Sequence, residues 1–167
     1  ILARTYARTY NLAAVVTRCA NIYGPGDLNF SRIIPGTIKS AILNRDPIIR
    51  SDGTPLRDYI YIDDVITAYF CLAKSLFLNK ENIRGEAFNF GTGKPISVLE
   101  LVKLIIKISG NDKLQPKIIS KSKIEGEIDR QYLSSEKARR ILGWHPRCGL
   151  FEGLNKTFNW YKTYLKK

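Results

Sequence analysis

The hydrophobic positions of this chain switch repeatedly between two spacings. Leu2, Tyr6 and Tyr10 recur at every fourth position, which is the spacing of a helix face. The run "AAVVTRCA" is apolar and rich in β-branched residues, which predicts a buried strand. Strands that alternate with helices indicate an α/β fold, and 167 residues suggest a single domain. The whole pattern predicts helices over 1–11, 31–43, 64–78, 98–109, 135–142 and 149–164, and strands over 13–20, 47–50, 57–62, 86–90 and 117–120.

Several predicted helices begin or end at residues that suit a helix terminus. Ser97 is followed three residues later by Glu100, which is the pattern of a capping box. Gly110 suits the left-handed residue that ends a helix. Ser31 and Ser134 precede two further helices, and we expect their hydroxyls to cap them.

A dense polar loop follows the first predicted strand. The stretch "RCANIYGPGDLNFSRIIPG" over 18–36 crowds glycine, proline, asparagine and arginine between a strand and a helix. Open α/β folds bind ligands at the carboxyl ends of their strands, and helix N-termini attract phosphate. Asn21 could donate to an anionic oxygen, and Arg32 lies in the first turn of the helix. The loop is therefore either an anion site or an ordinary turn, and the residues alone leave both open.

Charged residues also surround the next predicted strand, in "RSDGTPLRDYIYIDDV". Arg50 and Arg57 flank a turn. Arg57 either pairs locally with Asp58 or offers a bidentate fork to a diphosphate. Asp63 and Asp64 resemble paired catalytic carboxylates, but they stand before an apolar helix, so we expect one of them to cap it.

Three other features are weaker candidates for a site. Gly91 and Gly93 in "FNFGTGKPIS" resemble a phosphate loop, although the spacing matches neither GxGxxG nor a P-loop. Arg130 lies in a polar stretch over 120–131 that is expected to be irregular and solvated. His145, the only histidine, is more typical of a packing residue than of a catalyst.

Composition narrows the classes of function. The net charge of +12 would suit nucleic acid, an anionic membrane surface or a phosphorylated substrate, but no nucleic-acid recognition motif accompanies it. Cys19, Cys71 and Cys148 are widely spaced and odd in number, so a disulfide framework or a zinc site is not expected. No stretch has the length of a membrane span or the pattern of a signal peptide. We therefore expect a cytoplasmic protein with no membrane and no nucleic-acid partner.

Four motifs together resemble a known family. They are "TRCANIYGPGDLNFSRIIP", "DGTPLRDYIYIDDVITAYFCLAK", "FNFGTGKPISVLELV" and "DRQYLSSEKARRILGWHPR", in this order and over essentially the whole chain. They resemble the C-terminal half of the extended short-chain dehydrogenases that act on nucleotide sugars, and within them most closely the CDP-glucose 4,6-dehydratase branch. The resemblance implies a Rossmann domain that binds NAD, a smaller substrate lobe, and a homodimer whose interface includes the helix over 1–11.

The resemblance also has a clear departure. The glycine-rich NAD loop and the Tyr-x-x-x-Lys pair of the family do not occur in these 167 residues, and Tyr6 and Tyr10 have no lysine four positions on. We therefore expect residues 1–167 to be a single nucleotide-sugar-binding portion, without the NAD-binding part and without hydride chemistry of its own. No catalytic residue is assigned, and no metal site is expected.

What carries over is substrate binding. The resemblance places Cys19 and Ala20 beside the nicotinamide of NAD, and it assigns the nucleoside diphosphate sugar to six residues: Asn21, Arg32, Ile33, Arg50, Arg57 and Arg130. It implies conversion of a nucleotide hexose to the 4-keto-6-deoxy sugar by the complete enzyme. A 4-epimerase on the same scaffold, a non-catalytic nucleotide-binding or dimerising remnant, and a basic nucleic-acid binder remain the alternatives.

Overall fold

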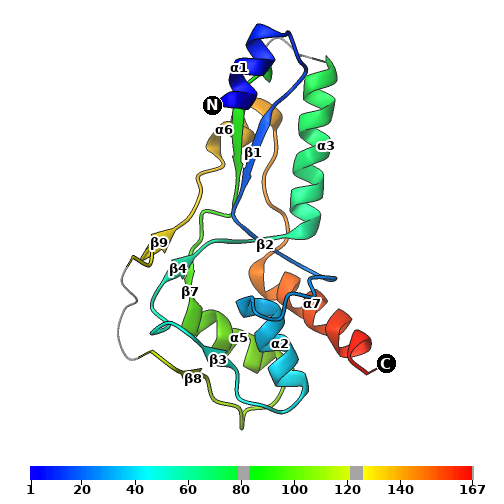
Figure 1. Cartoon of the computed structure of the whole chain (residues 1–167). Coiled ribbons are helices and arrows are strands. Elements are labelled where there is room, and N and C mark those ends of the chain that lie inside the picture. The colour runs from blue at the N-terminus through cyan, green and yellow to red at the C-terminus, as the bar shows by residue number, and fades with distance from the viewer. Residues whose placement is uncertain (79–82, 121–125, 167) are drawn as a thin grey trace.

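The computed structural model describes residues 1–78, 83–120 and 126–166, and its elements form two stacked groups (Figure 1). One group holds the N-terminal helix, the longest helix and a two-stranded parallel sheet. The other holds three helices beside several very short strands. In chain order the elements are α1 (Leu2–Thr9), β1 (Val16–Cys19), β2 (Asn21–Tyr23), α2 (Ile33–Ile42), β3 (Ile48–Ile49), β4 (Leu56–Arg57), β5 (Tyr59–Tyr61), α3 (Ile62–Leu78), β6 (Ala87–Phe90), β7 (Ile96–Ser97), α5 (Val98–Ser109), β8 (Lys117–Ile118), β9 (Arg130–Gln131), α6 (Glu136–Leu142) and α7 (Leu150–Tyr164).

Each group has its own hydrophobic core, and β5 contributes to both. Successive side chains of a strand point to opposite faces. Tyr59 and Tyr61 therefore enter the core formed with α2, α5 and α7. Ile60, between them, enters the core formed with α3, β6 and α6. All three residues are buried, so this short strand joins the two groups.

The strand pairing brings the polar loop of the sequence against the second charged segment. β1 pairs with β6 and β2 pairs with β5, both in parallel. In the second pair Asn21 lies opposite Tyr59. β4 pairs with β7 and β9, and β3 pairs with β8. The α/β class predicted from the sequence is confirmed, with most of the pairing parallel.

The first predicted strand differs from expectation. It covers Val16–Cys19 rather than 13–20, and it is not buried, because Thr17 and Arg18 are exposed. Among the described residues β1 pairs only with β6. Parallel strands usually have both faces covered. Val16 and Cys19 are half-buried, and Cys19 packs against the core formed with α3, β6 and α6, so the described elements cover this strand only in part.

The capping predictions have a mixed outcome. The capping box of Ser97 and Glu100 is confirmed, and Gly110 ends α5 in the left-handed conformation. Ser31 does not cap α2, because that helix begins one residue later and the Ser31 hydroxyl donates to Asn29. Ser134 is not the N-cap of α6 either, since Ser135 takes that position.

Asp64 has a different role from the one predicted. It is buried inside the first turn of α3 rather than before it. Its two carboxylate oxygens accept the backbone N–H groups of Arg147 and Cys148, at 2.9 and 3.0 Å. The side chain therefore ties the segment before α7 to α3, which a pattern of caps could not reveal. His145, predicted to pack, is exposed.

None of the described helices is both long enough and apolar enough to cross a membrane.

Gly153 gives a first test of this packing. A Cβ built on it would lie 2.3 Å from the hydroxyl oxygen of Tyr23, which is buried against α7. Gly153→Ala would gain helix propensity in most helices. Here we expect it to lower the free energy of unfolding by about 1–3 kcal/mol, because Tyr23 must move. Chemical denaturation measures the loss.

The Tyr23→Phe background provides the control for this experiment. It removes the oxygen that a Cβ at Gly153 would meet first. The cost of Gly153→Ala should therefore be smaller in the Tyr23→Phe protein than in the native one. Equal costs in both backgrounds would show that the close approach to the Tyr23 hydroxyl is not the cause, since the ring carbons of Tyr23 and Tyr61 at 3.0 Å remain.

Candidate functional site

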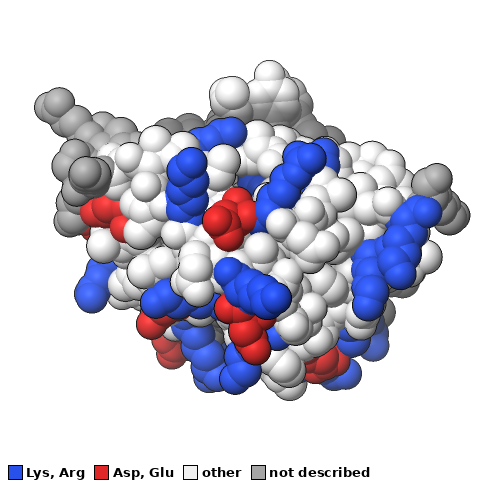
Figure 2. Space-filling view, turned by 90° about the horizontal axis from the view of Figure 1, so that it is seen from below, with Lys and Arg blue, Asp and Glu red and all other residues white. Residues whose placement is uncertain are grey.

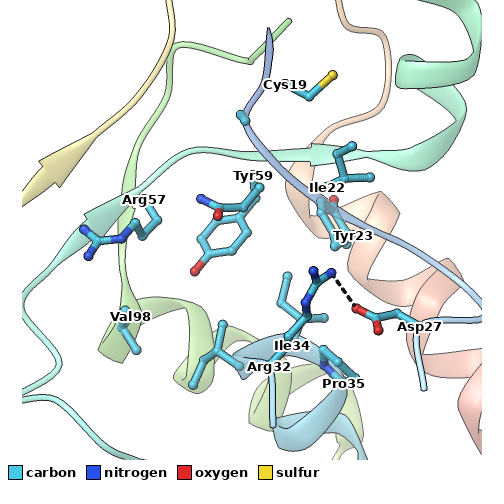
Figure 3. Close-up of a pocket in the computed structure, with 13 residues that line it drawn as sticks. Cys19, Ile22, Tyr23, Asp27, Arg32, Ile34, Pro35, Arg57, Tyr59 and Val98 are labelled. Carbon is cyan, nitrogen blue, oxygen red and sulfur yellow. Dashed lines mark hydrogen bonds and ion pairs between the residues drawn. The ribbon is translucent and has the colours of Figure 1, made fainter. Parts of the chain in front are cut away.

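A pocket of about 540 Å³ opens where β2, β5 and the start of α2 meet. This volume falls in the usual range of small-molecule sites. Figure 3 shows Arg57 and Tyr59 on one side, and Arg32 and Asp27 on the other. The pocket is lined by Cys19, Ala20, Asn21, Ile22, Tyr23, Asp27, Arg32, Ile33, Ile34, Pro35, Arg57, Tyr59 and Val98.

Asn21 begins β2 at the wall of the pocket. Its side-chain Nδ2 donates to the backbone carbonyl of Asp58 at 2.9 Å, and its own backbone N–H donates to the same oxygen at 3.0 Å. These bonds hold the side-chain amide beside β5. An asparagine amide has two N–H donors and one carbonyl oxygen. Asn21 can therefore still bind a ligand with its second N–H and its oxygen.

Arg32 stands at the N-terminus of α2, as the sequence predicts. Its guanidinium donates to the Asp27 carboxylate at 3.2 Å, and 63% of its side chain is exposed. An exposed ion pair of this kind is weak, so a ligand can exchange with Asp27 at little cost. The N-cap position has no side-chain cap. The first amides of α2 therefore add positive potential beside Arg32.

Arg57 is the more enclosed of the two arginines, with 17% of its side chain exposed. Its guanidinium donates to the carbonyl of Ile128 at 2.6 Å and lies 3.3 Å from the Glu127 carboxylate. The local pair with Asp58 is therefore not formed, and Glu127, seventy residues away in the sequence, takes that place. In Figure 3 the guanidinium points away from Tyr59. A ligand between the arginines would draw Arg57 from Glu127.

The Asp58 carboxylate binds the backbone of the glycine loop that follows β6. Its carboxylate is 1% exposed and accepts the backbone N–H groups of Thr92 and Gly93 at about 3.1 Å. It also accepts the Thr92 hydroxyl. The loop resembles a phosphate loop because its amides do bind an anion. That anion is a carboxylate of the same chain, so these amides hold the loop against β5.

The remaining predicted site residues are distributed around the pocket. Cys19 and Ala20 lie in its wall, and burial raises the pKa of the Cys19 thiol, which stays protonated. Ile33 lies beside Arg32. Arg50 does not reach this pocket but lines a neighbouring cavity of about 570 Å³. Arg130 is exposed in β9 and lies outside both linings, so its assignment stays a prediction.

The two cavities adjoin. Both are lined by Arg32, Ile33 and Val98, so the neighbouring cavity continues the pocket along α2. Arg57 lines only the pocket, Arg50 lines only the neighbouring cavity, and Arg32 lines both. A ligand with an anionic centre and a group extending to one side would fit this pair of cavities.

On the face of the molecule seen from below, the positive charge is not gathered into one patch (Figure 2). Figure 2 shows Lys and Arg spread over the face seen from below, with Asp and Glu between them. A nucleic-acid interface usually needs basic residues clustered on one face or along one helix. On this face the charge pattern therefore favours small anionic ligands over a nucleic-acid backbone.

Comparison with known proteins identifies the family. The model of the NAD dependent epimerase/dehydratase family matches residues 1–91, which is more than half of the chain. The chain belongs to this family. The family resemblance is thereby confirmed, and the matched segment contains the first two of the four motifs, with the whole of β2 and β5 and the start of α2. A specific similarity to the CDP-glucose enzymes is not shown.

The similar proteins are named for two related activities, a nucleotide-glucose 4,6-dehydratase and a nucleotide-glucose 4-epimerase. The dTDP-D-glucose 4,6-dehydratase of Bos taurus is 31% identical over 95% of this chain and 44% of its own. The crystal structure of dTDP-glucose 4,6-dehydratase from Bacillus anthracis, in complex with NAD, is 27% identical. It has a TM-score of 0.84 over 99% of this chain and 49% of its own.

A UDP-glucose 4-epimerase is similar to the same extent. The structure from Thermotoga maritima, with UDP-glucose, is 33% identical with a TM-score of 0.81 over 96% of this chain and 50% of its own. The chain therefore spans about half the length of these relatives. The fold of this chain matches the extended Rossmann-like structures of the epimerase/dehydratase family over nearly its whole length.

Sequence reasoning missed four residues that shape the site. Asp27 and Glu127 are the carboxylates that hold the two arginines, and Asp58 and Tyr59 organise the wall between them. Asp58 and Tyr59 follow Arg57 directly in the sequence. That proximity to a candidate binding residue was the one available signal.

Proposed function

We propose that this chain is the nucleotide-sugar-binding portion of an NAD-dependent nucleotide-hexose 4,6-dehydratase. The observation that carries the proposal is the pocket that places Asn21, Arg32 and Arg57 around one space at the N-terminus of α2. Two guanidinium groups, an amide and a helix N-terminus are together suited to a diphosphate. The similarity to dehydratases that act on nucleotide-activated glucose supports the same reading.

In this proposal the residues of the chain bind and orient the substrate. The diphosphate lies between Arg57 and Arg32, and it takes the place that Glu127 and Asp27 hold in the structure. The nucleoside extends along α2 into the neighbouring cavity beside Arg50. Arg130 lines neither the pocket nor the neighbouring cavity, so its side chain would have to move toward the pocket to bind a phosphate.

NAD would supply the hydride acceptor of such an enzyme. The loop that resembles a phosphate loop is already occupied, because the Thr92 and Gly93 amides donate to Asp58 and the Gly91 amide donates to Ser135. Cys19 and Ala20 offer only the edge of a site. We therefore propose that residues other than these 167 bind NAD and perform the hydride chemistry, and that the complete protein is a homodimer.

Two other functions remain candidates. A nucleotide-sugar 4-epimerase is favoured by the similarity to the Thermotoga maritima enzyme. A non-catalytic nucleotide-binding or dimerising remnant would use the same pocket without turnover. The base is also open, because the compared proteins name dTDP and UDP, whereas the sequence motifs favour CDP.

Direct binding measurements test the proposal. Isothermal titration calorimetry of the 167-residue chain with CDP, UDP and dTDP should give saturable 1:1 binding to at least one of them, at micromolar to low millimolar Kd. The same nucleosides without phosphate should bind much more weakly, because the charged groups of the pocket face the phosphates. NAD should not bind.

The outcomes separate the candidates. If the chain is folded and no nucleoside diphosphate binds, the proposed function is wrong. If the nucleoside binds as tightly as its diphosphate, the arginine pocket is not the site. With the complete protein and NAD, a 4-keto-6-deoxy product supports the dehydratase. A C4-inverted sugar supports the epimerase, and binding without product supports the remnant.

A further inference from the structure

The guanidinium of Arg57 is bound to its own chain at the edge of the pocket. Its Nη1 donates to the backbone carbonyls of Leu56 at 3.0 Å and Ile128 at 2.6 Å, and its Nη2 donates to the Glu127 carboxylate at 3.3 Å. Figure 3 shows this group pointing away from Tyr59. Arg57 therefore lines the pocket, but its charged end is held by the segment that precedes β9.

Glu127 lies at the junction of the two cavities. It lines the neighbouring cavity, whereas its partner Arg57 lines the pocket, and 28% of its own side chain is exposed. A carboxylate in this place acts on an anionic ligand in two ways. It repels the ligand, since like charges brought together are unfavourable. It also occupies the arginine that the ligand needs.

The other arginine of the pocket is paired as well, but more loosely. Arg32 pairs with Asp27 at 3.2 Å, and 63% of the arginine side chain is exposed, against 17% for Arg57. Water and salt screen an exposed pair, so it contributes little, while an enclosed pair is screened less. Each guanidinium thus has a carboxylate of the chain beside it. A bound anion must exchange with these carboxylates, and the exchange at Glu127 is the more costly of the two.

We propose that Glu127 competes with the ligand for Arg57: it holds the guanidinium until a diphosphate displaces it, and so limits how tightly the pocket binds anions. This inference rests on the proposed function and deepens it, because it names the residue that restrains binding at that site. When Arg57 turns from Glu127 to a phosphate, one charged hydrogen bond replaces another. A nucleoside without phosphate offers no anion for this exchange. Glu127 therefore weakens the binding of the diphosphate and leaves that of the nucleoside unchanged.

The test is the substitution Glu127→Gln, which keeps the size of the side chain and removes its charge. Calorimetry with the nucleoside diphosphate that binds best to the native chain should show about three- to tenfold tighter binding, because the competing ion pair is lost. The corresponding nucleoside should bind equally to both proteins. Asp27→Asn should tighten diphosphate binding by less, because its pair with Arg32 is the more exposed.

Two controls separate competition from a general change of charge. Glu152→Gln removes the same charge from an ion pair on α7, where Glu152 lies 2.7 Å from Lys156 and lines neither cavity. It should leave Kd within about twofold of the native value. The second control is Glu127→Gln in the Arg57→Ala background. There the arginine that is competed for is absent, so the gain should disappear.

The outcomes keep this inference apart from the proposed function. Unchanged or weaker diphosphate binding by the Glu127→Gln protein, beside measurable binding by the native chain, would overturn the inference and leave the proposed function intact. An equal gain for Glu152→Gln, or a gain that persists without Arg57, would show a general effect of charge and would also overturn it. Failure of the native chain to bind any nucleoside diphosphate would overturn the proposed function, and this inference with it.

Discussion

Replacing Arg57 with alanine is expected to weaken nucleoside diphosphate binding by about ten- to a hundredfold. Its guanidinium is 17% exposed and fixed at the pocket wall. A hydrogen bond to a charged group contributes about 1.5–3 kcal/mol, and 1.4 kcal/mol corresponds to a factor of ten in Kd. Arg32 is far more exposed, so its replacement should have a smaller effect. Calorimetry at fixed ionic strength measures both losses.

Two further variants make the Arg57 result interpretable. Arg57→Lys keeps the charge but loses the planar fork, so it should recover only part of the affinity. Arg140→Ala removes the same charge from the exposed surface of α6 and should leave Kd within about twofold of the native value. If Arg57→Ala binds like the native chain, or if Arg140→Ala loses as much affinity, a general positive field rather than this pocket explains the binding.

Replacing Asp58 with alanine is expected to lower the free energy of unfolding by about 3–5 kcal/mol. The carboxylate is buried and accepts the N–H groups of Thr92 and Gly93 as well as the Thr92 hydroxyl. Its loss removes these hydrogen bonds, and a hydrogen bond to a charged group contributes about 1.5–3 kcal/mol, part of which water restores at the exposed Gly93. Chemical denaturation measures the change, with circular dichroism as a check that the native fold remains.

Asp112→Ala is the matched control for Asp58. Asp112 is exposed, so the same substitution should change the free energy of unfolding by no more than about 0.5 kcal/mol. Asp58→Asn should fall between the two, because an amide offers one acceptor oxygen in place of two. A loss below 1 kcal/mol for Asp58→Ala would show that the bonds to the Gly91–Gly93 loop contribute little to stability.

The predictions that succeeded depend on residues close together in the sequence. The capping box of Ser97 and Glu100 needs only a spacing of three, and Gly110 needs only its own backbone freedom. The α/β class follows from hydrophobic periodicity. Residue type and position beside turns favour Asn21, Arg32 and Arg57, and the structure brings all three to one pocket, while their role in binding stays a prediction.

Some of the predictions that failed depend on the exact residue at which a helix begins, and others depend on contacts between distant segments. Ser31 and Ser134 suit a cap by type, yet α2 and α6 begin one residue later than each pattern implies. Asp64 reaches the segment before α7 rather than its own helix. The strand predicted over 57–62 divides at Asp58, because β4 pairs with β7 and β9 while β5 pairs with β2.

The sequence by itself determined the class of fold, the family and which side chains are of a type suited to an anion. These properties follow from local periodicity and from motifs whose order survives along the chain. Only the tertiary structure decided which partner each of these side chains has. Glu127 pairs with Arg57, and Asp58 accepts hydrogen bonds from the Gly91–Gly93 loop. The reason is physical: a hydrogen bond or an ion pair depends on distance in space, and strand pairing brings these residues together across long separations in sequence.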